Sequence, residues 1–197
     1  MIYEIAAIAA LAHQCAPEVA TEAVVPLVVT ESGGDSLAIN VNRGPRVRAG
    51  SLTEGATLVR RFIAAGYTVD VGLAQVNSAN FERLGLTVEQ AFDPCANLAA
   101  ASSVLQESYG RASRQYSGLD AISATYSLYN TGTMTRGLFN GYVGRIWSAA
   151  NALGSIPATP APPVASPANS ATAAKPRNDS DDWVVGQLAS NSVEVFR

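Results

Sequence analysis

The composition of the chain changes abruptly at about residue 155, and this change limits where a folded domain can form. Residues 155–182, SIPATPAPPVASPANSATAAKPRNDSDD, are rich in proline, alanine and serine and hold few large apolar side chains. Such a segment cannot bury enough apolar surface to offset its ordering entropy, so we expect a mobile, disordered linker. Residues 183–197 regain large apolar side chains, which predicts a short tail that docks on a partner or on its own domain. One folded domain is therefore expected over residues 1–154.

Within this predicted domain the apolar residues follow mostly helical spacing, in segments joined by short loops. The expected helices cover about residues 4–16, 21–32, 52–65, 94–110, 120–131 and 138–150. Local signals mark several helix ends, namely the capping-box pairs Ser51–Glu54 and Thr87–Gln90, Asp120 as a cap, and Gly66 and Gly132 as terminators. On the last helix a single apolar stripe is expected, formed by Leu138, Phe139, Tyr142, Val143, Ile146, Trp147 and Ala150.

One stretch departs from the helical period. In YTVDVGLAQVN, residues 67–77, the side chains of Tyr67, Val69, Val71 and Leu73 alternate with smaller or polar neighbours. A period of two predicts a short extended or hairpin segment. The expected fold class is therefore α+β, mostly α, with a small β element and a disordered C-terminal tail.

The charge and hydropathy of the chain exclude two classes of partner. A net charge of −3 and a pI near 5.1 leave no general basic field, so nucleic acid is not an expected partner. Arg43, Arg46 and Arg48 form a small basic cluster that we interpret as a solvated loop.

No apolar run approaches the roughly 20 residues that a stable membrane span requires. The first 16 residues carry Glu4 and are interpreted as a helix, with the remnant of an export signal as the alternative.

Glu31 occupies an unusual place for an acidic residue. In VVTESGGDSLAIN, residues 28–40, it ends an apolar helix, and Val24, Leu27 and Val28 lie on the same helix face. Burial and the negative end of the helix dipole both favour the protonated carboxyl, so we expect a raised pKa. A carboxylic acid that keeps its proton near neutral pH can act as a general acid. The alternative is an exposed residue in a fraying last turn.

Two further motifs carry amide and hydroxyl groups. GLAQVN, residues 72–77, places Gln75 and Asn77 on one side of an extended segment, and SLYNTG, residues 127–132, ends a helix with Tyr129 and Asn130. Amides that both donate and accept hydrogen bonds suit the acetamido and hydroxyl groups of a sugar. Taken singly, each amide could instead satisfy backbone groups, and Tyr129 could belong to the core.

In this order, ESGGDS, GLAQVN and SLYNTG resemble the three signature segments of the lytic transglycosylases with a goose-type lysozyme fold. HQCAPEVA and FDPCANLAAAS further resemble the transglycosylase subunits of type IV secretion systems, so the resemblance covers about residues 11–150. The chain departs from the family pattern at Ala74, Ser127 and Thr131. Pro26, inside the helix before Glu31, requires that helix to start late or to kink.

The resemblance implies an enzyme that cleaves the β-1,4 bond between N-acetylmuramic acid and N-acetylglucosamine in peptidoglycan and forms a 1,6-anhydro product without a cofactor. Glu31 would be the catalytic acid and then the base. The cleft would be lined by Ser32, Gln75, Asn77 and Asn130, and Tyr129 would hold the Glu31 carboxyl or the sugar. The alternative is a lysozyme-type hydrolase in which Asp70 acts as a second carboxylate that activates water.

The resemblance also implies a place of action, the periplasm, and partners among secretion-system proteins. Counting alone leaves Cys15 and Cys95 either bridged or reduced, whereas an oxidising periplasm favours a disulfide between them. His13 and the two cysteines lack a fourth ligand at a suitable spacing, so no metal site is expected. A wall-binding scaffold that recruits secretion proteins through residues 183–197 is the alternative to an enzyme that opens the wall locally for a secretion or conjugation apparatus.

Overall fold

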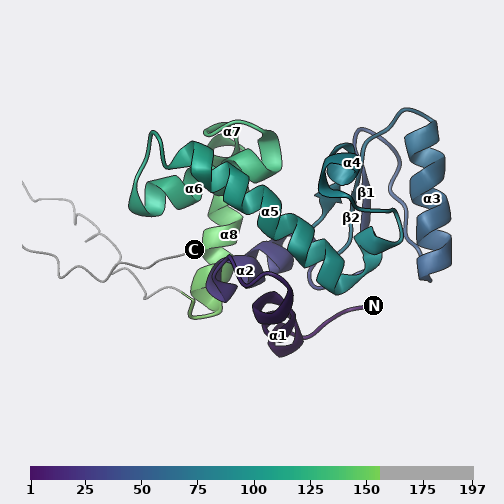
Figure 1. Ribbon diagram of the computed structural model, residues 1–197, viewed down its shortest axis with the longest axis horizontal. Helices are drawn as coiled ribbons and strands as arrows, with labels where there is room; N and C mark the ends of the chain where they lie inside the picture. The colour runs from purple at the N-terminus through teal and green to yellow at the C-terminus, as the bar shows by residue number, and fades with distance from the viewer. Residues whose placement is uncertain (156–197) are drawn as a thin grey trace, which may run out of the picture. The chain divides into compact units, whose positions relative to one another are not determined.

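The computed structural model describes residues 1–155, and this part of the chain is mostly helical (Figure 1). The helices are α1 (Ile5–Cys15), α2 (Thr21–Glu31), α3 (Leu52–Ala64), α4 (Phe81–Leu84), α5 (Pro94–Ala112), α6 (Gly118–Thr131), α7 (Arg136–Phe139) and α8 (Tyr142–Ala152). The strands are β1 (Ile39–Val41), β2 (Val69–Val71) and β3 (Val76–Asn77), and two 3-10 turns cover Ser78–Asn80 and Gln90–Phe92. The predicted tail and nearly all of the predicted linker lie outside the described residues, so the predicted domain boundaries stay predictions.

Helix α5 is the central packing element. It contacts α1 and α6, while α2 packs between α1 and α8. In Figure 1, α5 runs from the side of α6 and α7 to the side that holds the sheet and α3. The core contains Ile8, Leu27, Leu98, Leu105 and Ile146, which are all nearly or completely buried. These residues come from α1, α2, α5 and α8, so one core joins the helix that ends in Glu31 to the other helices.

The three strands form an antiparallel sheet in the order β1–β2–β3. The hairpin predicted for residues 67–77 is confirmed, with Val71 of β2 opposite Val76 of β3. On its other side Val71 pairs with Ile39 of β1, a strand that the sequence did not predict. Three residues are too few for an alternating pattern to stand out from a loop.

Most predicted helix ends agree with the structure. Ser51 accepts a hydrogen bond from the Glu54 N–H, and Gly132 ends α6 in the left-handed conformation with φ of 70°. Helix α2 runs through the buried Pro26 from Thr21 to Glu31. The prediction that Asp120 caps α6 is wrong, because the helix begins at Gly118 and Asp120 lies inside its first turn.

The predicted last helix is two helices. Gly141, with φ of 77°, separates α7 from α8, and the Asn140 side chain accepts a hydrogen bond from the Tyr142 N–H at 2.9 Å. This break ends the single stripe, and α7 packs against both α6 and α8. Phe139 is consequently 88% exposed, so its predicted place in the apolar stripe is wrong.

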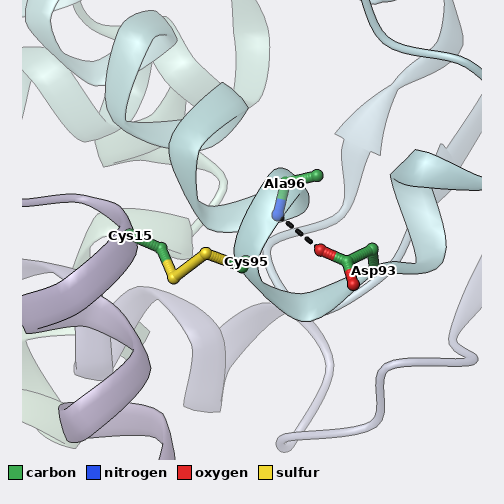
Figure 2. Close-up of a disulfide and its surroundings, with 4 residues drawn as sticks. All are labelled: Cys15, Asp93, Cys95 and Ala96. Atoms are coloured by element: carbon green, nitrogen blue, oxygen red, sulfur yellow. Dashed lines mark hydrogen bonds between the residues drawn. A yellow bond between two sulfur atoms is a disulfide. The ribbon is translucent and has the colours of Figure 1, made fainter.

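A disulfide joins Cys15 at the end of α1 to Cys95 in the first turn of α5 (Figure 2). The two Cα atoms are 5.2 Å apart. Asp93 caps the same end of α5 by accepting a hydrogen bond from the Ala96 N–H at 2.8 Å. The bridge closes a loop of 80 residues, which contains the Glu31 motif and the whole sheet.

Between residues 1 and 155, no helix combines the length and apolar character that a membrane crossing needs. The same part of the chain holds no cluster of three or more histidine, cysteine, aspartate or glutamate side chains suited to a metal ion. His13 is exposed on α1.

Candidate active site

A cleft of about 1280 Å³ opens beside the C-terminal end of α2. Its walls come from three regions: the sheet and the segments flanking its strands, the face of α5 around Glu107 and Arg111, and the segment from the end of α6 to Asn140. Five of the six predicted site residues line it, namely Glu31, Gln75, Asn77, Tyr129 and Asn130. The fold therefore brings together three motifs that lie about 45 to 100 residues apart in the sequence.

Glu31 is the last residue of α2, and the turn before it contains the fully buried Leu27 and Val28. Burial raises the pKa of its carboxyl from 4.5 to about 7, and the negative charge of Asp70 acts in the same direction. A hydrogen bond from Tyr142 and the positive charge of Arg145 lower this pKa without cancelling the effect of burial. The raised pKa that the sequence predicted is confirmed, with desolvation as its main cause.

Tyr142 on α8 donates a hydrogen bond from its hydroxyl to Oε1 of Glu31. Burial raises the pKa of the Tyr142 hydroxyl well above its ordinary value, so the group stays protonated and remains a donor. The sequence placed Tyr142 in an apolar stripe, and no local signal links two residues that are 111 positions apart. Tyr129, which was expected to hold the Glu31 carboxyl or the sugar, donates its hydroxyl to the Ala74 carbonyl oxygen at 2.8 Å.

Replacing Tyr142 by phenylalanine should raise the pKa of Glu31 further. The lost hydrogen bond favours the ionised carboxylate, so its removal makes ionisation harder. The alkaline limb of any activity that needs protonated Glu31 should move to higher pH. The rate at low pH should fall about tenfold, because the carboxyl loses the donor that orients it. A pH–rate profile of Tyr142→Phe checks both effects, and an unshifted alkaline limb would contradict the assignment of Tyr142.

Ser32 does not line the cleft, contrary to the expectation from the resemblance. Its hydroxyl donates to the Leu73 carbonyl oxygen at 2.7 Å and accepts from the Gly34 N–H at 3.1 Å. Ser32 therefore ties the first motif to the second, as Tyr129 ties the third motif to the second. Both residues position the loop at 72–75 against the catalytic helix.

Gln75 lies in the hairpin turn with φ of 50°, not in an extended segment as predicted. Its Nε2 donates to the carbonyl oxygens of Ala38 and Gly72 at 3.1 and 2.9 Å. Both amide hydrogens are thus engaged, and the oxygen is the atom that can accept a hydrogen bond from a ligand. Gln75 consequently suits the N–H of an acetamido group or a sugar hydroxyl.

Asp70 lies in the same cleft, held by three asparagine side chains. Its Oδ2 accepts from Nδ2 of Asn40 and Asn42 at 2.9 and 3.0 Å, and its Oδ1 accepts from Nδ2 of Asn77 at 2.5 Å. These contacts fix the carboxylate in place, and its charge contributes to the raised pKa of Glu31. Asn77 is thereby directed toward Asp70, a contact between paired strand residues that the sequence did not reveal.

Residues 9–144 match the family profile of the transglycosylase SLT domain. The chain belongs to this family. The match contains every residue of the cleft described above, together with Tyr142. It confirms the family resemblance seen in the three motifs, as well as the expected mostly helical, lysozyme-like fold with a small sheet.

Several curated relatives of this chain carry the name virB1. It is 38% identical to Protein virB1 of Rhizobium radiobacter over 154 residues, covering 78% of this chain and 64% of the relative. It is 41% identical to the type IV secretion system protein virB1 of Brucella abortus biovar 1 (strain 9-941) over 130 residues, covering 64% of this chain and 55% of the relative. It is 34% identical to Protein virB1 of Agrobacterium fabrum (strain C58) over 143 residues, covering 72% of this chain and 58% of the relative. The chain thus spans less than two thirds of the length of these relatives, and no solved structure matches it significantly.

The SLT domain anchors its second motif through Asn97, a completely buried side chain on α5. Oδ1 of Asn97 accepts from the Ala74 N–H at 2.8 Å, and Nδ2 donates to the carbonyl oxygens of Val71 and Ala91 at 2.9 and 2.8 Å. Gly72 permits this approach, because a Cβ there would lie 2.3 Å from the Ala91 carbonyl oxygen. Asn97 was not among the predicted residues, although an asparagine inside the apolar run CANLAAA was a usable signal.

Replacing Asn97 by alanine should lower the free energy of unfolding by about 3 kcal/mol, because three buried backbone groups lose their partners. The variant should also lose activity beyond what its stability explains, since the turn that carries Gln75 is released. Urea denaturation measures the first effect, and activity well below the melting temperature measures the second. Asn151→Ala, at an exposed position of α8, is the control and should change neither.

Proposed function

We propose that this chain is a peptidoglycan lytic transglycosylase with Glu31 as its single catalytic acid and base. The observation that carries the proposal is a carboxyl with a pKa of about 7, placed at the wall of a polar cleft within an SLT domain. Near neutral pH such a group is divided between its two protonation states. It can therefore donate a proton in one step and accept one in the next.

In the first step, protonated Glu31 transfers its proton to the glycosidic oxygen between N-acetylmuramic acid and N-acetylglucosamine. The C1–O bond breaks, the N-acetylglucosamine leaves as an alcohol, and the 2-acetamido group of the muramic acid stabilises the cationic C1. In the second step, ionised Glu31 takes the proton of the C6 hydroxyl, whose oxygen bonds to C1. The product is a 1,6-anhydro sugar, Glu31 is protonated again, and water is not consumed.

The surrounding residues support this sequence of proton transfers. The Tyr142 hydroxyl orients the carboxyl and stabilises its ionised form between the two steps. The oxygen of Gln75 accepts a hydrogen bond from the substrate's acetamido N–H, and Asn130 contacts the sugar from another wall of the cleft. Tyr129 acts by holding the Ala74 carbonyl and hence the turn that presents Gln75.

The names of the relatives support a role in a type IV secretion system, in which the enzyme opens the cell wall locally so that the apparatus can assemble. The Cys15–Cys95 disulfide is consistent with the periplasm, an oxidising compartment. Residues 183–197 are proposed to dock on secretion-system proteins. A pull-down that compares the full chain with one ending at Ser155 tests this role, and equal recovery of partners would exclude the tail as the docking element.

Digestion of purified peptidoglycan followed by mass spectrometry of the fragments tests the reaction itself. A transglycosylase leaves 1,6-anhydro ends, which are lighter by one water than ordinary reducing ends. Intact strands after prolonged incubation would refute the enzyme and favour a wall-binding scaffold.

A lysozyme-type hydrolase is the second candidate, favoured by the fixed position of Asp70 in the same cleft. Reducing ends among the products would support it. Replacing Asp70 by asparagine separates the two candidates: a hydrolase that needs this carboxylate should lose about 10²-fold or more in rate. A transglycosylase should retain most of its rate, and its alkaline limb should move to lower pH because a charge that raises the pKa of Glu31 is gone.

A further inference from the structure

The cleft has a charge opposite to that of the whole chain. Its lining contains four arginines, Arg43, Arg83, Arg111 and Arg136, and three acids, Glu31, Asp70 and Glu107. Because the pKa of Glu31 is about 7, this residue contributes less than a full negative charge at neutral pH. The lining is therefore positive overall, although the chain carries a net charge of −3. Catalysis on neutral sugar rings does not require this excess of positive charge in the cleft.

Three of these arginines are available to a ligand. Arg83 forms an ion pair with Glu107, whereas Arg43, Arg111 and Arg136 form none with any residue between 1 and 155. They come from three different walls: Arg43 follows β1, Arg111 lies in the last turn of α5, and Arg136 begins α7. Arginines without an ion pair thus line the cleft on three of its walls.

The backbone at Arg43 supports a functional role for its side chain. Its φ of 59° is unusual for a residue other than glycine, and among residues 1–155 only Gln75 shares this property. Both residues line the cleft. Strained backbone conformations of this kind concentrate at functional sites, where the position of the side chain outweighs the conformational cost. Arg43, which the sequence suggested only as part of a solvated loop, thus lines the cleft with a constrained backbone.

We propose that Arg43, Arg111 and Arg136 bind carboxylates of the substrate, in the first place those of the acidic peptide attached to N-acetylmuramic acid. The proposal rests on the proposed function and adds a preference for strands that carry peptides. A guanidinium matches a carboxylate through two parallel hydrogen bonds, a geometry that hydroxyl and acetamido groups do not offer. A muramic acid without its peptide exposes a lactyl carboxylate of the same chemistry, so the test must separate these two sources.

The test uses the full chain carrying Glu31→Gln, so that binding is measured without cleavage. Three ligands of equal sugar length are compared: glycan strands with peptides, the same strands after enzymatic removal of the peptides, and neutral N-acetylglucosamine oligomers. Each ligand is titrated with the Glu31→Gln chain and with the same chain carrying one further substitution, Arg43→Gln, Arg111→Gln or Arg136→Gln. Arg61→Gln, at an exposed arginine on α3 outside the cleft, is the control for loss of one positive charge. In parallel, the wild-type chain is assayed for cleavage of the peptide-bearing strands.

Each cleft variant should weaken the binding of peptide-bearing strands about threefold to tenfold more than the binding of neutral oligomers. Higher ionic strength should reduce the same preference, and lysine at these positions should restore part of it. A loss confined to the strands without peptides would identify the lactyl carboxylate as the bound group and would overturn the assignment to the peptide. Equal binding of all three ligands, with cleft variants no different from Arg61→Gln, would overturn the proposal. Because the binding ratio does not depend on cleavage, an inactive wild-type chain would count against the proposed function alone.

Discussion

Replacing Glu31 by glutamine should lower the rate of peptidoglycan cleavage by about 10²–10⁴-fold, the usual contribution of a positioned acid and base. Glutamine keeps the size of the side chain and can still accept the hydrogen bond from Tyr142. It cannot donate a proton to the glycosidic oxygen or take one from the C6 hydroxyl. Release of soluble fragments from labelled peptidoglycan measures the loss. Glu22→Gln, at an exposed position in the first turn of the same helix, should retain full activity.

The same substitution should stabilise the protein at alkaline pH. The pKa of Glu31 is raised from 4.5 to about 7 on folding, so the folded state holds this proton more tightly than the unfolded state. Stability from this group is complete below pH 4.5 and is lost as the pH rises through 7, by roughly 3 kcal/mol at most. Glutamine does not titrate, so the stability of the variant relative to the wild type should increase as the pH rises from 4.5 through 7. Thermal unfolding from pH 4 to pH 9 measures the difference.

Two results would contradict this account of Glu31. An active Glu31→Gln variant would remove the residue from the reaction. A wild-type minus variant stability difference that stays constant with pH would show that the carboxyl is not buried in the folded protein. The wild-type rate should also decline above pH 7, because the fraction of protonated Glu31 falls there.

Removal of the Cys15–Cys95 disulfide should lower the free energy of unfolding by about 4 kcal/mol. The bridge closes a loop of 80 residues, and in the chain-entropy model a loop of this size strongly restricts the unfolded chain. For a domain of this length the loss corresponds to roughly 8–16 °C in melting temperature. Calorimetry of the double variant Cys15→Ser/Cys95→Ser measures it.

Reduction of the wild-type protein supplies the matched control for this prediction. A reducing agent should bring the melting temperature of the wild type to that of the double variant and leave the variant itself unchanged. Equal melting temperatures of oxidised wild type and variant would contradict a stabilising bridge. Because α5 also lines the cleft, activity near the lowered melting temperature should be lost together with the structure.

Several features of the site could be predicted because their signals are local. The direction of the Glu31 pKa shift followed from its place at the end of an apolar helix, since desolvation by burial is the largest cause of the shift. The hairpin that carries Gln75 followed from period-two alternation. The capping pair Thr87–Gln90 forms both expected hydrogen bonds, although it begins a 3-10 turn and Asp93 starts the long helix.

Features that depend on distant contacts could not be predicted. Tyr142 was placed in an apolar stripe, and that stripe was assigned to one continuous helix that Gly141 divides. Asn97 looked like one polar residue in an apolar run, and its three backbone partners belong to other segments. Ser32 matched a family motif, but its hydroxyl is used by the protein's own backbone.

The sequence by itself determined which segments become helices, where the acid lies, and to which family the chain belongs. Spacing, capping and burial by neighbouring turns act within a few residues, so they can be read along the chain. Only the tertiary structure decided which hydroxyl meets Glu31, which asparagines hold Asp70 and which arginines face the cleft. Those contacts join groups brought together by packing around α5, and linear order does not encode their distances.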